Sequence, residues 1–114
     1  MHIELRKKIF GVEVVKIEYE LGEYKFEWDS DKAEKNWKKH KVKFEDAAYV
    51  FFDENRIDEF DEIHSDFEDR YKIIGKVENI LTVIYTEREE NFRIISARQA
   101  TKREEVQYYE QFHY

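Results

Sequence analysis

Arg98 is a residue whose type and position could do chemistry, because it stands where two sequence patterns meet. In "NFRIISARQATKREE", residues 91–105, an alternating apolar run reaches Arg98, and a basic segment with a helix-start signal follows. Arginine stays charged, and its planar fork can bind two phosphate oxygens at once. Arg98 is therefore either a cation aimed at an anionic group or a strand-end charge paired with an acid from residues 45–69.

Strand alternation divides residues 92–98 between two faces of the predicted strand. The face of Arg98 also carries Phe92, Ile94 and Ser96, and the opposite face carries Arg93, Ile95 and Ala97. Because Ile95 and Ala97 suit packing beneath helices, we expect Ser96 and Arg98 to open onto the uncovered face of a sheet. There Ser96 would join Arg98 in binding a substrate.

Glu87 and Arg88 end the preceding predicted strand. Alternation sends them to opposite faces unless a bulge intervenes, so at most one should serve the same site as Arg98. Glu87 could act as a general base or orient an arginine. The alternative is an ordinary ion pair beside a hairpin, which contributes little.

His40 is the side chain most suited to exchange a proton near neutral pH. It shares a predicted helix stripe with Asn36 and Trp37, so the alternative is a packed or capping histidine. Lys39 beside it, and Arg70 at the start of a strand, could bind phosphate or simply face solvent. The four histidines lie far apart in the sequence and there is no cysteine, so we predict neither a metal site nor a cofactor.

The elements that must position these residues follow from periodicity. Residues 3–10 and 12–19 favour strands with a turn at Gly11, and "YKFEW" after "LGE" favours a third. Asp29 or Ser30 could cap a helix that carries Ala33, Asn36, Trp37 and His40 at helical spacing, and "FEDAAYVFF" predicts a second helix.

The second half of the chain favours strands. A short strand around Ile57 and Phe60 and an exposed loop should precede "RYKIIGKV", "ILTVIYTE" and "NFRIISAR", which at hairpin distances predict an antiparallel meander. Thr101 and Glu104 form a capping-box signal for a last helix. That helix should have an apolar edge at Val106, Tyr109 and Phe112. The result is an α+β fold, an antiparallel sheet packed by helices on one face.

The length and the charge of the chain restrict the classes of function that it can have. A chain of 114 residues is one domain on length alone, and its net charge of −7 argues against a general polyanion binder. Charge is nevertheless segregated: residues 32–43 hold six lysines and one acid, whereas residues 45–69 hold eleven acids and one arginine. No apolar stretch has the length of a membrane span or a signal peptide, so we expect a cytoplasmic protein without a membrane partner.

Four segments together resemble one protein family. "KFEWDSDKAEKNWKKHKVKFEDAAYVF", "DRYKIIGKV", "LTVIYTERE" and "FRIISARQATKREEVQYYE" are similar to the BrnT toxins of bacterial type II toxin–antitoxin pairs. The likeness covers about residues 25–110, with the blocks in order and their spacing intact. We therefore expect a BrnT-like toxin domain at 25–114, with residues 1–24 as an N-terminal β-hairpin extension of the same domain.

The resemblance implies a RelE-like fold and a metal-independent endoribonuclease. It also implies a BrnA-like antitoxin of the ribbon-helix-helix class as partner, with operator DNA bound only through the toxin–antitoxin complex. In such an enzyme Arg98, Glu87, His40 and Arg88 would be catalytic, and Lys39, Arg70 and Ser96 would bind RNA. The extra hairpin leaves open a homo-oligomer formed through it.

The sequence departs from the family pattern at several charged positions. Lys41 and Glu89 stand where the family has glycines, Lys43 replaces a serine cap, and Glu105 replaces an arginine. Lost positive charge lowers RNA affinity, because phosphate neutralisation supplies much of it. The alternative is thus a toxin-like binding module without catalysis, acting in antitoxin complexes and operon repression.

Overall fold

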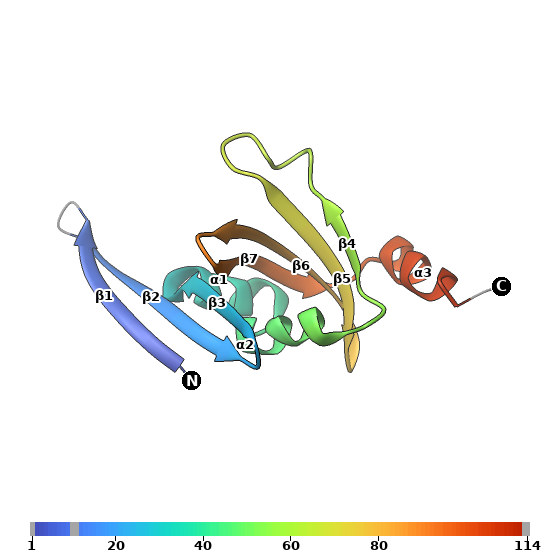
Figure 1. The fold of residues 1–114 in the computed structure, drawn as a ribbon, viewed down its shortest axis with the longest axis horizontal. Coiled ribbons are helices and arrows are strands. Elements are labelled where there is room, and N and C mark those ends of the chain that lie inside the picture. Colours follow the sequence, from blue (N-terminus) through green and yellow to red (C-terminus); the bar gives the residue numbers. More distant parts are fainter. Residues whose placement is uncertain (1, 10–11, 113–114) are drawn as a thin grey trace.

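The computed structural model describes residues 2–9 and 12–112, which form an α+β fold on one seven-stranded sheet (Figure 1). The elements in chain order are β1 (His2–Ile9), β2 (Val12–Leu21), β3 (Tyr24–Asp29), α1 (Ser30–His40), α2 (Phe44–Ala47), the 3-10 helix η1 (Ala48–Phe52), β4 (Ile57–Phe60), β5 (Arg70–Val77), β6 (Asn79–Arg88), β7 (Asn91–Gln99) and α3 (Lys102–Glu110). From residue 24 onward this order confirms the sequence prediction. The turn predicted at Gly11 lies outside the described residues.

The strand order across the sheet is β1-β2-β3-β7-β6-β5-β4. The predicted antiparallel meander of β5, β6 and β7 is confirmed, and β4 extends it by pairing antiparallel with β5. One contact departs from a purely antiparallel sheet: β3 pairs with β7 in parallel, with Phe26 opposite Phe92 and Glu27 opposite Arg93. Sequence periodicity gives no information on this pairing, since parallel neighbours can be far apart along the chain. The first three strands are thereby attached directly to the strand that carries Arg98.

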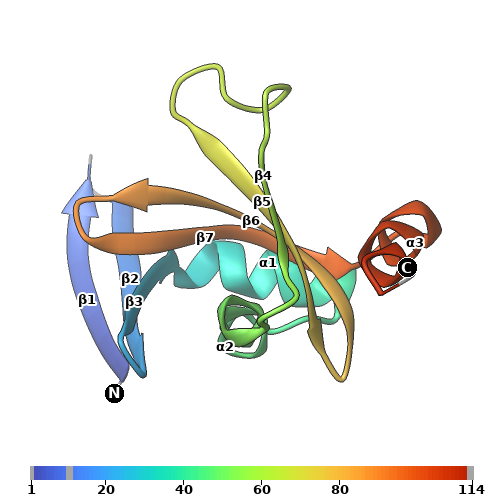
Figure 2. The ribbon, with the colours of Figure 1, turned by 45° about the vertical axis from the view of Figure 1, so that its right-hand side comes forward.

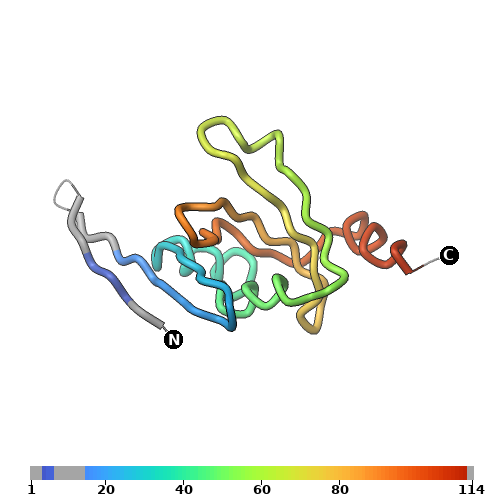
Figure 3. The backbone as a smooth tube through the Cα atoms, viewed as in Figure 1, coloured from blue at the N-terminus to red at the C-terminus, as the bar shows by residue number. Residues whose placement is uncertain are grey.

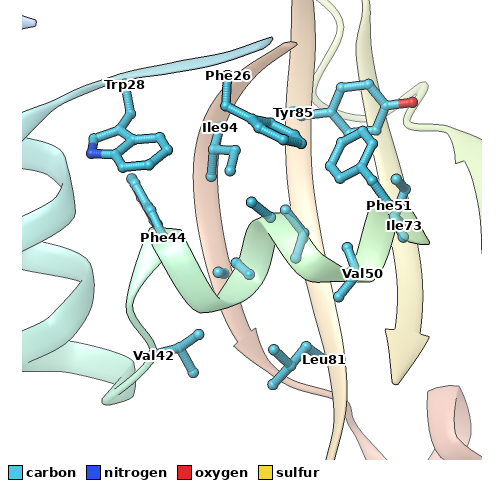
Figure 4. Packing of buried hydrophobic residues seen from close by; sticks show 14 of the residues in the cluster. Phe26, Trp28, Val42, Phe44, Val50, Phe51, Ile73, Leu81, Tyr85 and Ile94 are labelled. Atoms are coloured by element: carbon cyan, nitrogen blue, oxygen red, sulfur yellow. The ribbon is translucent and has the colours of Figure 1, made fainter. Parts of the chain in front are cut away.

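One face of the sheet is covered by α1, α2 and η1, which lie below β6 and β7 in Figure 2. Phe26, Trp28, Val83 and Ile94 from three strands are buried beneath these helices. Figure 4 shows Phe44 of α2 against Trp28, with the two rings edge to face at a centroid distance of 5.8 Å. This aromatic layer fixes the backbone of β7 from below.

The last helix packs on the other face, at the end of the sheet opposite β1 (Figure 1). Tyr108 is buried there against Ile74 and Ile80, which alternation points away from the main core. The prediction that all helices share one face is therefore wrong, and the predicted apolar edge of Val106, Tyr109 and Phe112 does not face the sheet. Those three side chains are 45–46% exposed, because α3 turns Glu104 and Tyr108 toward the sheet.

A buried amide attaches α1 to β7. Asn36 donates from Nδ2 to the carbonyl oxygens of Val42 at 3.0 Å and Ala97 at 2.8 Å, and its Oδ1 accepts from the Ala97 N–H at 3.0 Å. The predicted stripe is right for Asn36 but wrong for Trp37, which is 43% exposed. The Lys41 ammonium instead lies over the Trp37 ring, with its Nζ atom 5.4 Å from the ring centroid.

Three turns in the described part of the chain use a left-handed backbone without glycine, and in the turn between β5 and β6 the left-handed residue is Glu78, with φ 60°. Lys41, which ends α1, has φ 57°, and Glu89, in the turn between β6 and β7, has φ 56°. The capping box predicted from Thr101 and Glu104 is confirmed at the start of α3. The cap predicted at Asp29 is not formed, and Lys43 also begins its helix without a side-chain cap. The Asp29 carboxylate accepts a hydrogen bond from Arg93 instead.

Candidate functional site

A bulge in β7 decides which side chains reach the face of the sheet opposite α1 and α2, called here the open face. Ile84 pairs with Ser96 and Tyr85 pairs with Ile94, so Ile95 is an extra residue without a partner in β6. A bulge reverses the alternation beyond it. Ile94 and Ala97 are consequently both buried on the helix-covered face, while Ser96 and Arg98 point to the open face.

The bulge corrects two sequence expectations. Phe92 and Ile94 do not share a face with Arg98, because they pack in the core beneath the helices. Ile95 does not pack under helices either, since it lines a hollow on the open face together with Ser96. The expectation that Ser96 and Arg98 reach the uncovered face agrees with the structure.

The hollow, called here the groove, has a volume of about 370 Å³. The loop between β4 and β5, residues 61–69, forms one wall and stands away from the sheet in the backbone trace of Figure 3. Strands β5, β6 and β7 form the floor. The lining residues are Asp61, Ile63, His64, Arg70, Lys72, Ile84, Ile95, Ser96 and Arg98. Three of the residues predicted from the sequence, Arg98, Arg70 and Ser96, thus meet in one place.

Arg98 is held by a buried carboxylate. Its Nη1 and Nη2 donate to Oε1 and Oε2 of Glu104 at 2.7 and 3.2 Å, and Lys72 Nζ lies 3.4 Å from the same Oε2. The sequence alternative placed the partner of Arg98 in residues 45–69, whereas the partner is Glu104 in α3. Burial raises the pKa of Glu104, but hydrogen bonds from Arg98 and the Thr101 N–H outweigh it and lower the pKa to about 2.

The neighbouring cations are also paired with acids of the same chain. Arg70 and Arg88 both lie near Glu68, at 3.8 and 3.4 Å, and Lys72 lies 3.7 Å from Glu59 as well as near Glu104. Further along the open face, Arg93 makes 2.9 Å ion pairs with Glu27 and Asp29. The open face therefore combines several cations with little uncompensated charge.

The remaining predicted residues do not line the groove. Glu87 and Arg88 end β6 on opposite faces, as alternation predicts, and both are exposed. Lys39 is exposed on α1, and His40 is half-buried at the end of that helix. Burial and the positive charges of Lys39 and Arg98 lower the pKa of His40, so the neutral imidazole is favoured there.

Sequence reasoning missed Lys72, Glu104 and the pair formed by Asp61 and His64. Alternation in "RYKIIGKV" could have placed Lys72 beside Arg70. Glu104 was assigned to the helix cap, a role that it fulfils while also binding Arg98. Asp61 and His64 lie in a loop, where no periodicity shows which way a side chain points.

Two searches of the described part of the chain gave no result. No group of three or more His, Asp or Glu side chains among these residues is arranged to hold a metal ion. Likewise, none of the described helices has the length and apolar character needed to cross a membrane.

Comparison with known proteins gives the family. The family described as "Ribonuclease toxin, BrnT, of type II toxin-antitoxin system" matches residues 28–104, well over half of the chain. The matched region runs from β3 to the first turn of α3 and contains every residue that lines the groove. A search of curated proteins gave no match. A family of this type has an RNA target and a protein antitoxin. This chain belongs to the BrnT family of ribonuclease toxins of type II toxin–antitoxin systems.

Proposed function

We propose that this protein is an endoribonuclease toxin that cleaves RNA in the groove on the open face without using a metal ion. The observation that carries the proposal is the meeting of Arg98 from β7 with Lys72 and Arg70 from β5, across β6, in one hollow of about 370 Å³ that Ser96 also lines. Positive side chains around an open hollow suit a phosphate group of a single RNA strand.

Metal-free cleavage of RNA uses the 2′-hydroxyl of the substrate as nucleophile. It needs a proton acceptor for that hydroxyl and cations for the negative charge that develops on the phosphorus oxygens. We assign Arg98 to the developing charge, because Glu104 fixes its guanidinium through two hydrogen bonds. Lys72 adds a second positive charge, and Arg70 and Ser96 bind the RNA on either side.

The other predicted residues are assigned roles outside the groove. Arg88 and Lys39 contribute further contacts to RNA phosphates, since both are exposed cations. His40 and Glu87 are retained as candidate proton acceptors. The lowered pKa of His40 keeps its imidazole neutral, as a base requires.

The partner in this proposal is a BrnA-like ribbon-helix-helix antitoxin, and the complex of the two proteins binds operator DNA in the cytoplasm. The toxin domain, residues 25–114, is RelE-like. Residues 1–24 extend it as a β-hairpin, and the antiparallel pairing of β1 with β2, from His2 opposite Tyr19 to Ile9 opposite Val12, supports this. In the described part of the chain, β1 is the outer strand at one edge of the sheet and offers a place for a second copy to add.

A specific observation favours a second candidate, a binding module without catalysis. Arg98, Arg70 and Lys72 each lie within 4 Å of a carboxylate of the same chain. A phosphate must compete with these acids, most of all with the buried Glu104. Such a protein would bind antitoxin and repress the operon but would not cut RNA.

RNA cleavage by the antitoxin-free full-length protein separates the two. We expect the protein to cut RNA, and Arg98→Ala to lower the rate by about 100-fold or more while circular dichroism shows a folded protein. Arg103→Ala, an exposed cation of α3 outside the groove, is the matched control and should cleave normally. Absence of cleavage of both free and ribosome-bound RNA by the unmodified protein would establish the binding module instead.

A further inference from the structure

A histidine that the sequence left without a role lies in the groove. His64 belongs to the loop between β4 and β5 and lines the same hollow as Arg98, Lys72 and Ser96. We propose that His64 is the general base of the reaction and that Asp61 is its positioning residue. This inference rests on the proposed function, because it names the group that takes the proton.

The geometry of the pair suits that role. His64 Nδ1 lies 2.9 and 3.2 Å from the two carboxylate oxygens of Asp61, so the Nδ1–H donates to the carboxylate. An imidazole held in this way keeps Nε2 free to accept a proton. The Asp61 side chain is 13% exposed, whereas the His64 side chain is 64% exposed. The carboxylate that orients the imidazole is therefore largely buried, and the imidazole itself is accessible to RNA.

Hydrogen bonds attach the loop that carries His64 to the start of β5 and to β6. The Asp61 N–H donates to the Arg70 carbonyl at 2.8 Å, and the Arg70 N–H donates to Ser65 Oγ at 2.9 Å. Thr86 Oγ1 on β6 donates to the Asp69 carbonyl at 2.6 Å. These contacts hold the base against the strands that carry the cations, which a reaction between fixed groups requires.

The surroundings contain both signs of charge. Arg70, Lys72 and Arg98 line the groove on the sheet side, and Asp66 and Glu68 line the adjoining hollow with His64 and Arg70. His40, the base suggested by the sequence, belongs to the helix that covers the opposite face and does not line the groove. His64 is therefore better placed than His40 to meet a 2′-hydroxyl whose phosphate lies on Arg98.

The proposed step conserves atoms and charge. Nε2 of His64 takes the proton of the 2′-hydroxyl while the 2′-oxygen forms a bond to phosphorus, and the bond from phosphorus to the 5′-oxygen breaks. The 5′-oxygen takes a proton from water, and the hydroxide left behind recovers the proton from His64. The products are a 2′,3′-cyclic phosphate and a 5′-hydroxyl. Arg98 and Lys72 stabilise the negative charge at phosphorus.

The experiment compares full-length variants on a short labelled RNA. His64→Ala should lower kcat by about 100-fold or more with KM nearly unchanged, and added imidazole should restore part of the loss by filling the vacated position. Asp61→Asn should lower kcat by about tenfold or more at similar KM, because the tautomer is no longer fixed. Glu62→Gln, an exposed neighbour outside the groove, is the matched control. His64 is exposed and Asp61→Asn keeps the shape of its side chain, so these variants should fold, and circular dichroism checks this.

The outcomes separate this inference from the proposed function. Cleavage by His64→Ala at the normal rate, with Arg98→Ala inactive, would overturn the role of His64 and leave the ribonuclease intact. A loss of activity in His64→Ala that imidazole does not restore in the folded variant would count against a base at this position. An unmodified protein that cleaves no RNA would overturn both proposals together.

Discussion

The guanidinium of Arg98 and the carboxylate of Glu104 meet through two hydrogen bonds, at 2.7 and 3.2 Å, across the junction of β7 and α3. The same carboxylate oxygen Oε1 accepts from the Thr101 N–H at 2.8 Å and so closes the helix cap. A single buried side chain thus starts α3 and orients the cation of the groove. Stability of the helix and geometry of the site are coupled through Glu104.

Glu104 should make the protein sensitive to acid. Its pKa of about 2 in the folded state lies below the ordinary value of 4.5, so the folded state binds fewer protons than the unfolded state. The stabilisation is complete above about pH 4.5 and is lost as the pH falls toward 2. It amounts to about 3 kcal/mol for a shift of this size. Urea unfolding at pH 5 and pH 3 should show the loss, and Glu104→Gln should show less of it. An equal pH dependence in both proteins would contradict this assignment.

Lys41→Gly should stabilise the protein. Lys41 has φ 57°, a conformation that costs an L-residue about 1 kcal/mol and costs glycine almost nothing. We expect a gain of about 0.5–1 kcal/mol in the free energy of unfolding. Lys38→Gly is the matched control, since it removes a lysine from inside the same helix and should cost about 1 kcal/mol. Two substitutions that shift the urea midpoint in the same direction would argue against the backbone explanation.

Asn36→Ala should be strongly destabilising. The amide makes three hydrogen bonds to the backbone, and its removal leaves the Ala97 N–H and carbonyl without these bonds in a buried place. We expect a loss of about 3 kcal/mol, measured by chemical unfolding. Because Ala97 lies between Ser96 and Arg98, RNA cleavage should also fall in the folded fraction. Asn36→Asp would keep the acceptor but place a buried carboxylate oxygen against two carbonyl oxygens, so it should be at least as destabilising as Asn36→Ala.

Gly75→Ala should reveal how closely η1 approaches β5. A Cβ at this position would lie 2.9 Å from the Val50 Cβ and 3.3 Å from the Val50 carbonyl oxygen. Such overpacking costs about 1–3 kcal/mol. Val50→Ala leaves a Cβ in place, so it should relieve the clash only in part, through a small shift of η1. A double-mutant cycle measures this coupling, and strictly additive losses would show that the two positions do not interact.

Much of the architecture follows from the sequence because local patterns determine it. Alternating Ile, Val and Tyr residues predict β5, β6 and β7, and the pair Thr101 and Glu104 predicts the start of α3. The bulge at Ile95 is different, because nothing in the composition or the apolar pattern of the strand marks it. This one additional residue nevertheless places the β7 side chains before it on the opposite faces from those that alternation counted back from Arg98 predicts.

The site was predictable only in part for the same reason. Arg98 and Arg70 stand out as strand-end cations, and the structure brings both to the groove. The position of Glu104, the partner of Arg98, depends on α3 packing against the open face. Periodicity did not reveal this packing, because the apolar residues Val106 and Tyr109 are exposed and Tyr108 is buried. His64 depends on the fold of a loop, where hydrogen bonds to Arg70, not an apolar repeat, determine the position.

Because β3 pairs in parallel with β7, the sheet cannot be completed until late in the synthesis of the chain. Glu27 on β3 and Arg93 on β7 bind each other although 66 residues separate them. Contacts between such distant segments form slowly, because a long stretch of chain must be ordered first. As the ribosome extends the chain, β3 must wait for its neighbour, and the groove is absent until β7 and Glu104 have emerged. The cations of the groove therefore come together only after the chain has been made as far as β7 and the start of α3.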